Sequence, residues 1–203
     1  MNHIESEYWD ELAQLNPETV CIMTMADYQM RKRGYTLPIL NQDYLVLPYQ
    51  KEIRRLVEEG TSKGENLTTE FTLMVLFYLL KTKNIPLERK WISEKDLLGG
   101  ETFFRGPHAL SVALIEKKYG DDPGGFIEAG KVLGGTPVHF GDRSVALDVF
   151  PRIPIIYILW MGDEEFPAKA GVLFDASIAS HFTLDMIWIM VHEVSKRLVE
   201  AAG

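Results

Sequence analysis

The chain has 203 residues, 46% of them hydrophobic, and no linker-like stretch divides it, so we expect one domain with a substantial core over residues 1–203. Its net charge of -8 disfavours a general attraction to nucleic acid or to an anionic membrane surface. The single cysteine, Cys21, excludes an internal disulfide and favours a reducing cytoplasm.

The first third of the chain predicts a helix followed by a β-hairpin. Glu5–Leu15 is amphipathic, and Asn16-Pro17 ends it because proline restricts the residue before it. Two apolar runs, Thr36–Leu40 and Tyr44–Leu47, flank the polar segment Asn41-Gln42-Asp43, which we interpret as the turn of the hairpin.

Two further helices are expected before the middle of the chain. Leu56 and Val57, set among charged residues, predict a short helix that Gly60 ends. Asn66 is a good helix cap, and the Leu, Met and Phe residues after it predict a helix over Leu67–Lys81 that is buried on most sides.

The middle of the chain is rich in glycine. Pro86–Gly100 is expected to be irregular, with Gly99-Gly100 adopting conformations that other residues resist. His108–Tyr119 and Pro123–Leu133 then predict two helices, the second ended by Gly134-Gly135.

The last third is where we expect most of the sheet. Val138–Phe140 and Arg143–Phe150 are joined by Gly141-Asp142, a pair suited to a two-residue turn that would place Val138 opposite Val145. Ile155–Trp160 predicts a central strand covered on both faces, and Val172–Phe174 predicts another short strand.

A final helix follows Thr183, which we expect to cap it. Its inward stripe comprises Leu184, Ile187, Val191, Val194 and Leu198. The elements together predict an α+β fold in which an antiparallel sheet, mainly in the C-terminal half, is packed by helices.

Neither a membrane span nor an export signal is expected. The apolar stretches 71–80 and 153–161 are much shorter than the roughly 20 residues that cross a bilayer. Residues 1–7 lack the basic and apolar regions of a signal peptide. These features again favour a cytoplasmic protein.

An acidic block is the first candidate for chemistry. It comprises Asp163, Glu164 and Glu165, and with Asp175 it offers carboxylates for a hard cation such as magnesium or calcium. A bound cation would activate water, as in a metal-dependent hydrolase or lyase. Alternatively, the block is a solvated turn in which Phe166 is the anchor and the carboxylates accept hydrogen bonds from the backbone.

Histidines provide the second candidate, because neutral imidazole binds metals and can be an axial ligand of cobalt or iron in a tetrapyrrole. His108 follows Gly106 in the glycine-rich loop, His139 lies beside the predicted hairpin turn, and His181 precedes the last helix. Each can equally have a surface or hydrogen-bonded structural role. Phe103 and Phe104, which follow the Gly-Gly pair, are expected to line a cleft suited to a flat apolar ligand.

Several familiar catalytic motifs are absent from the sequence. His192-Glu193 resembles half of a zinc-protease helix, but Lys196 occupies the position of the second histidine. No glycine-rich segment has the spacing of a Walker or dinucleotide-binding loop, and there is no nucleophile elbow. The apolar neighbours of Cys21 favour a buried, unreactive thiol.

Many proline, glycine, tryptophan and acidic positions from Leu67 onward follow a family pattern. They are Pro86-Leu87, Lys90-Trp91-Ile92-Ser93, Gly99-Gly100, Phe103-Phe104, Leu133-Gly134-Gly135, Gly141-Asp142, Phe150-Pro151-Arg152-Ile153-Pro154, Trp160, Gly162-Asp163-Glu164-Glu165-Phe166-Pro167 and Leu173-Phe174-Asp175. In these segments the chain resembles a bacterial family of domains of unknown function, found largely in anaerobes and sometimes fused to a cysteine-rich iron–sulfur domain. The resemblance implies a setting of anaerobic metabolism, where corrinoid-dependent methyl transfer is common.

These features favour a non-catalytic accessory protein that binds a corrinoid (cobalamin) or related tetrapyrrole. Such cofactors supply their own reactivity and need orientation and an axial ligand from the protein. The expected binding residues are Phe103, Phe104, Gly106, His108, His139 and His181. A corrinoid-dependent or redox enzyme is the expected partner. The alternatives are the metal-dependent hydrolase or lyase and an assembly module for a redox enzyme.

Overall fold

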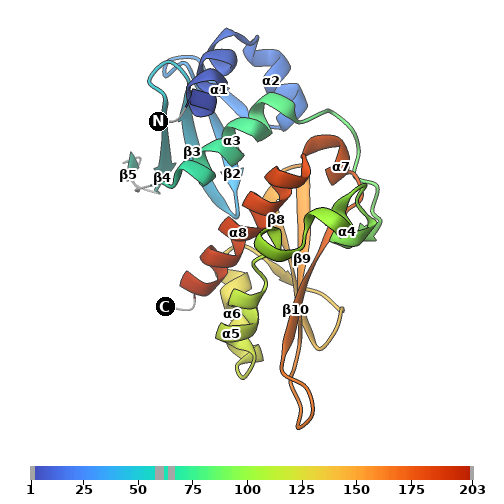
Figure 1. Ribbon diagram of the computed structural model, residues 1–203. Coiled ribbons are helices and arrows are strands. Elements are labelled where there is room, and N and C mark those ends of the chain that lie inside the picture. The colour runs from blue at the N-terminus through green and yellow to red at the C-terminus, as the bar shows by residue number, and fades with distance from the viewer. Residues whose placement is uncertain (1–2, 58–61, 64–66, 202–203) are drawn as a thin grey trace.

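A computed structural model describes residues 3–57, 62–63 and 67–201 of the chain (Figure 1). Within these ranges helices combine with two antiparallel five-stranded sheets, ordered β1-β2-β3-β4-β5 and β6-β10-β9-β8-β7. The fold is therefore α+β, as predicted. The second sheet lies in the C-terminal half, and the first sheet extends the single N-terminal hairpin that the sequence predicted.

Two helices open the chain where one was predicted. α1 (His3–Gln14) confirms the first amphipathic helix, and α2 (Pro17–Thr24) follows directly. The side chain of Asn16 accepts a hydrogen bond from the Glu18 N–H at 2.9 Å, and Pro17 occupies the first helical turn, where its missing N–H costs nothing. The dipeptide that ends α1 thus also begins α2.

The first sheet contains the predicted hairpin with a different turn. Its strands are β1 (Asp27–Gln29), β2 (Gly34–Ile39), β3 (Gln42–Leu47), β4 (Glu52–Leu56) and β5 (Ser62–Lys63). Ile39 pairs with Gln42, so the turn consists of Leu40 and Asn41, both at positive φ (48° and 62°). The predicted turn at 41–43 is wrong because a two-residue turn with positive φ fits the twist of the strands better.

The short helix predicted at Leu56 and Val57 is also wrong. β4 pairs with β3, with Ile53 opposite Val46, and Leu56 ends that strand. Arg and Leu favour helices, but this intrinsic preference is small and pairing with an adjacent strand outweighs it here. The predicted helix end at Gly60 and the predicted cap at Asn66 lie outside the described residues.

α3 (Thr69–Lys81) confirms the predicted buried helix. Its cap is Thr68, whose hydroxyl accepts from the Phe71 N–H at 3.0 Å. The Phe71 ring lies 5.2 Å from that of Tyr44 on β3, so α3 packs against one face of the first sheet. α1 lies on the same side (Figure 1).

The glycine-rich middle forms short elements. They are β6 (Trp91–Ile92), the 3₁₀ turn η1 (Glu94–Asp96), α4 (Gly100–Phe103), the 3₁₀ turn η2 (Gly106–His108), α5 (Ala113–Tyr119) and α6 (Pro123–Val132). The helix predicted from His108 begins only at Ala113, because η2 ends at His108 and the chain is extended at Ala109. α6 agrees with the prediction, and the Asp122 carboxylate caps it by accepting from the Gly125 N–H at 2.8 Å.

The second sheet contains β7 (Thr136–Pro137), β8 (Arg143–Phe150), β9 (Ile153–Trp160) and β10 (Lys169–Asp175). Pro137 pairs with Val145, so the predicted pairing of Val138 with Val145 and the two-residue turn at 141–142 are wrong. The Val138 N–H continues this register by donating to the Ser144 carbonyl at 3.1 Å. The Ser144 hydroxyl donates to the Val138 carbonyl and accepts from the Phe140 N–H, at 2.8 and 2.9 Å.

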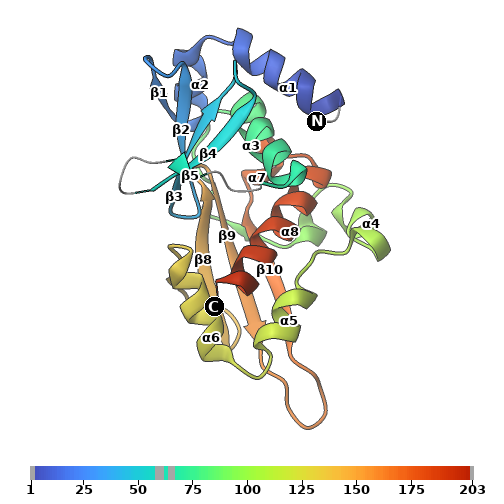
Figure 2. The same ribbon diagram turned by 90° about the vertical axis from the view of Figure 1, so that its left-hand side faces the viewer.

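α7 (Ile178–His181) leads into α8 (Leu184–Glu200), which packs on the second sheet beside α5 and α6 (Figure 2). The predicted inward stripe is confirmed: Leu184 is half-buried, and Ile187, Val191, Val194 and Leu198 are at most 1% exposed. Thr183 is the cap residue, although its side chain makes no capping hydrogen bond. In the described part of the chain, no helix combines the length and apolarity needed to cross a bilayer.

Arg152 lies in the turn between β8 and β9 and joins this turn to two other segments, the end of α2 and the residues after α3. Its guanidinium donates to the carbonyls of Ile22 (3.2 Å) and Met23 (2.6 Å) at the end of α2. It also donates to the Ile85 carbonyl (3.2 Å) and the Asn84 side chain (2.6 Å) after α3. The rigid guanidinium fork matches this set of acceptors in a way that a lysine ammonium does not.

Asp175, the last residue of β10, fixes the segment before β6. Its carboxylate accepts from the N–H groups of Glu88 (3.0 Å), Arg89 (2.7 Å) and Ser177 (3.0 Å). Burial raises the pKa of this carboxyl, but the hydrogen bonds from Ser177, Glu88 and Arg89 outweigh burial and hold it below its ordinary value.

We expect Arg152→Lys to lower the free energy of unfolding by about 2–4 kcal/mol, because it keeps the charge but loses most of the carbonyl contacts. Denaturant unfolding measures this loss. Arg143→Lys is the matched control, since Arg143 is exposed and its guanidinium bonds the adjacent Asp142 carbonyl. Equal stabilities of the two variants would contradict the role given to Arg152.

We expect Asp175→Asn to destabilise the fold by about 1–3 kcal/mol at neutral pH, because the amide cannot satisfy the three N–H donors. A carboxyl whose folded pKa is lowered stabilises the fold above its unfolded pKa and loses this contribution as pH falls through the folded pKa. The difference from the wild type should therefore be constant above about pH 5 and shrink below about pH 4. Asp122→Asn is the control, because asparagine caps helices as well as aspartate does.

Candidate functional site

Four rings form a continuous row across the glycine-rich loop and α8, and we call them the aromatic row: Phe103, His108, Trp188 and His192. The Phe103 and His108 rings are stacked, with centroids 4.8 Å apart at 20°. His108 meets Trp188 edge to face at 5.9 Å, and Trp188 stacks on His192 at 6.0 Å and 15°. His108 is exposed and the other three are half-buried, so the row is open to solvent on one side.

Three glycines shape the loop that carries Phe103 and His108. Gly99 and Gly106 have φ of 77° and 56°, a conformation that side chains disfavour. At Gly100, a Cβ would lie 1.9 Å from the Glu94 carbonyl oxygen, so the loop folds closely onto η1 there. The prediction that Gly99-Gly100 adopts a conformation that other residues resist is confirmed: Gly99 has a positive φ, and a side chain at Gly100 would clash with Glu94.

Two hydrogen bonds attach this loop to α8. The Trp188 indole N–H donates to the Ala109 carbonyl at 3.2 Å. The Ser111 hydroxyl lies 2.9 Å from His192 Nδ1. Trp188 and His192 are four residues apart on the helix and therefore lie on one face.

Four of the predicted cofactor-binding residues lie together here. Phe103 and His108 form one end of the row, Gly106 lies in the same 3₁₀ turn as His108, and Phe104 meets Phe103 edge to face at 5.1 Å. Trp188 and His192 were not predicted to belong to the same site. Their spacing of four residues on the predicted last helix indicates that they lie on one helix face. Nothing in the sequence, however, indicates that this face meets residues 103–111.

The other two predicted histidines lie elsewhere. His139 is exposed in the connection between β7 and β8. His181 is 4% exposed, and its Nδ1 accepts from the Lys83 N–H at 3.3 Å. Burial, together with Arg152 and Lys83, lowers the pKa of His181. The structure therefore keeps His181 neutral and away from the aromatic row.

The aromatic row offers flat apolar faces and imidazole nitrogens together. With Nδ1 bonded to Ser111, the ring of His192 is oriented, and Nε2 is the nitrogen left for a ligand. The His108 ring makes no hydrogen bond to any residue that the structure describes. Stacking and one axial nitrogen are the contacts by which proteins hold large planar metal complexes.

The acidic block forms a turn between β9 and β10. Asp163 Oδ1 accepts from the N–H groups of Glu165 and Phe166, both at 2.8 Å. These two hydrogen bonds lower the pKa of Asp163. The arrangement matches the solvated turn, but Phe166 is 66% exposed, so its expected role as an anchor is wrong.

The structure does not bring Asp175 to the acidic block. The six residue steps of β10 from Lys169 to Asp175 span about 20 Å, and the block lies beyond Lys169. Among the described residues, no three or more His, Cys, Asp or Glu side chains are grouped so as to hold a metal ion. The predicted ligands Asp163, Glu164, Glu165 and Asp175 are therefore not assembled as one site.

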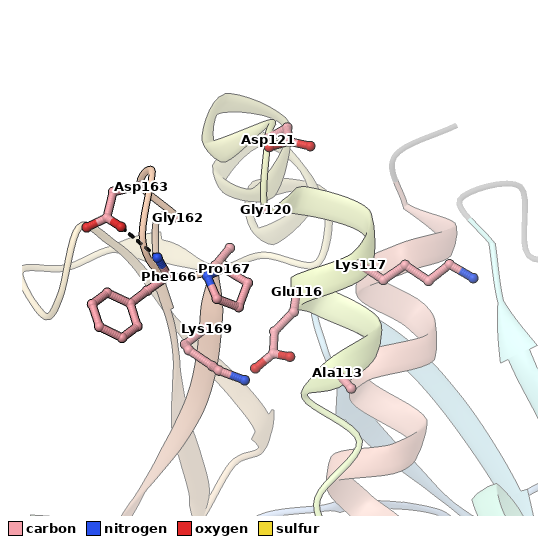
Figure 3. Close-up of a pocket in the computed structure, with 11 residues that line it drawn as sticks. Ala113, Glu116, Lys117, Gly120, Asp121, Gly162, Asp163, Phe166, Pro167 and Lys169 are labelled. Carbon is pink, nitrogen blue, oxygen red and sulfur yellow. Dashed lines mark hydrogen bonds between the residues drawn. The ribbon is translucent and has the colours of Figure 1, made fainter.

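A cleft of about 570 Å³ separates α5 from the turn between β9 and β10 (Figure 3). Glu116 and Lys169 extend into the space between its walls, and Lys117 points away from the turn. The Glu116 carboxylate accepts from the Ala170 N–H at 3.0 Å, which links α5 to β10. The lining contains no histidine, cysteine or serine, so it offers no nucleophile–base pair of the usual kind.

Cys21 is half-buried on α2. Burial, with Asp27 nearby, raises the pKa of its thiol. Because the thiolate is the reactive form, Cys21 is not an activated nucleophile.

Residues 16–197 match a family described as a domain of unknown function, DUF3786. No curated protein and no solved structure matches the chain. The matched segment contains both sheets, the aromatic row and the acidic turn. This chain therefore belongs to the DUF3786 family.

Proposed function

We propose that this protein binds a corrinoid (cobalamin) or a related tetrapyrrole on the aromatic row and acts as a non-catalytic carrier or accessory protein. The observation that carries the proposal is the side-by-side arrangement of two imidazoles and two large apolar rings, from segments about 80 residues apart. A planar macrocycle needs an extended apolar contact and one axial nitrogen, and the row offers both.

His192 is the proposed axial ligand. Its Nδ1 is held by Ser111, and an outer hydrogen bond of this kind orients an imidazole toward a metal through Nε2. Trp188 and His108 are proposed to contact the macrocycle. The bound cofactor would supply the reactivity, and the protein would orient it and limit its access to water.

The family resemblance supports a setting for this activity. Relatives in anaerobes, some fused to iron–sulfur domains, suggest that the protein works in the cytoplasm beside a corrinoid-dependent methyl-transfer or redox enzyme. The separated carboxylates give no support to the metal-dependent hydrolase.

Titration with aquocobalamin under anaerobic conditions, followed by visible absorbance, tests the proposal. The wild type should give a saturable shift in the spectrum, and His192→Ala should abolish it because the axial nitrogen is lost. Trp188→Leu should weaken binding without removing the shift at saturation. His139→Ala is the matched control, since this exposed histidine lies outside the row. An unchanged spectrum with the wild type, for both cobalamin and haem, would rule out tetrapyrrole binding.

Ser111→Ala separates orientation from ligation. Removing the hydroxyl should weaken cobalamin binding by about 10–100-fold while leaving the bound spectrum similar, because Nε2 remains available. Absorbance titration measures both quantities. Ser93→Ala provides a control in a different turn, where the hydroxyl bonds Asp96. If Ser111→Ala binds as tightly as the wild type, His192 is not positioned in the way we propose.

A further inference from the structure

The end of the β9–β10 hairpin exposes large apolar side chains, and we call this region the hairpin tip: residues 160–166. Trp160, Met161 and Phe166 are 42%, 46% and 66% exposed. Asp163, Glu164 and Glu165 are exposed between them. The hairpin tip therefore combines apolar anchors with a concentrated negative charge.

The shape of the hairpin tip is fixed before any contact is made. Glycines on the neighbouring segments make room for the Trp160 ring: a Cβ at Gly171 or Gly141 would lie 3.1 or 2.9 Å from it. The Met161 N–H donates to Asp142 at 2.8 Å, and Asp163 holds the turn around Phe166. A preformed surface loses little conformational entropy on binding.

A groove of about 310 Å³ lies on the outer face of the first sheet, which we call the basic groove. Leu45 and Leu47 lie in its floor, whereas their neighbours Tyr44 and Val46 point into the main core, as alternation along a strand requires. The rest of the lining is Arg31, Lys32, Gln50, Arg54 and Leu56.

The basic groove keeps a positive charge on a chain whose net charge is -8. Arg54 is paired with Glu52 on the same strand. Arg31 and Lys32 are exposed in the turn between β1 and β2, and neither forms an ion pair with any residue that the structure describes. Two cations beside a leucine floor are suited to an acidic segment with an apolar anchor.

The hairpin tip and the basic groove match each other in chemistry but lie at opposite ends of the molecule (Figures 1 and 2). Since the hairpin is rigidly paired along its length, its tip cannot reach the groove of the same copy. We propose that the hairpin tip of one copy docks into the basic groove of a second copy. Phe166 would lie against Leu56, the half-buried leucine of the lining, above the buried Leu45 and Leu47, and the acidic block would face Arg31 and Lys32.

A contact of this kind is head-to-tail, because it joins two different surfaces. After one such contact, one copy keeps a free groove and the other keeps a free hairpin tip, so the assembly grows into a ring or an open chain. Lys169, which pairs with Trp160, and Arg143, which pairs with Leu159, lie next to the hairpin tip and partly offset its negative charge. This inference does not depend on tetrapyrrole binding.

Charge reversal with sedimentation analysis tests the proposal on the full chain. The wild type should show a mass that rises with protein concentration and falls in about 0.5 M salt, where screening is strong. Two double variants, Arg31→Glu with Lys32→Glu and Glu164→Lys with Glu165→Lys, should each lose association. All four positions are exposed, so circular dichroism should show folded protein in both cases.

The decisive sample is an equimolar mixture of the two double variants. In the mixture the unchanged acidic tip of the groove variant meets the unchanged basic groove of the tip variant, and the reversed basic tip meets the reversed acidic groove, so mixing should restore association. Phe166→Ala should weaken association of the otherwise unchanged chain by about tenfold or more, as expected for an aromatic anchor. A wild type that is monomeric at every concentration, double variants that associate like the wild type, or a mixture that stays monomeric would each overturn the proposal.

Discussion

The hydrogen bonds of the Arg152 guanidinium fix the N-terminal helices relative to the second sheet, and the rest of the structure depends on them. The guanidinium bonds the last carbonyls of α2, where the negative end of the helix dipole favours a cation. The same group holds the segment that follows α3. Because Arg152 lies in the turn between β8 and β9, these bonds fix the end of the sheet against the packed N-terminal helices. The positive charge also contributes to the neutral state of the nearby, buried His181.

Hydrogen bonds from β9 in turn fix α8 on the second sheet. The Tyr157 hydroxyl of β9 donates to the Val191 carbonyl at 3.0 Å and lies 2.8 Å from the Ser195 hydroxyl. These bonds, with the buried stripe, set the rotation of the helix about its axis. Trp188 and His192 are then directed to the half-exposed face, where the glycine-rich loop closes over them. The aromatic row therefore depends on a rotation fixed in the core.

Much of the fold could be predicted from local pattern, and the errors have specific causes. The long apolar periodicities predicted α3, α8, β8 and β9 correctly. The predicted register of β7 was wrong by one residue because the connection to β8 is longer than two residues and is held by the Ser144 hydroxyl, which no pattern of hydrophobicity records. β4 was not predicted, because this segment is a strand only through its pairing with β3, which local sequence does not show. The aromatic row was only half predicted, since 81 residues separate Ser111 from His192.

Side chains that satisfy the backbone have few lone pairs left for chemistry. Asp175 accepts three backbone hydrogen bonds and Asp163 accepts two, and their lowered pKa values show how strongly these bonds favour the charged form. A cation at Asp175 would compete with bonds that hold the chain in place at both oxygens, whereas at Asp163 both bonds fall on Oδ1. The contacts that we propose instead use groups that make no such backbone bonds, namely His192 Nε2 in the aromatic row, Phe166 at the hairpin tip, and Arg31 and Lys32 in the basic groove.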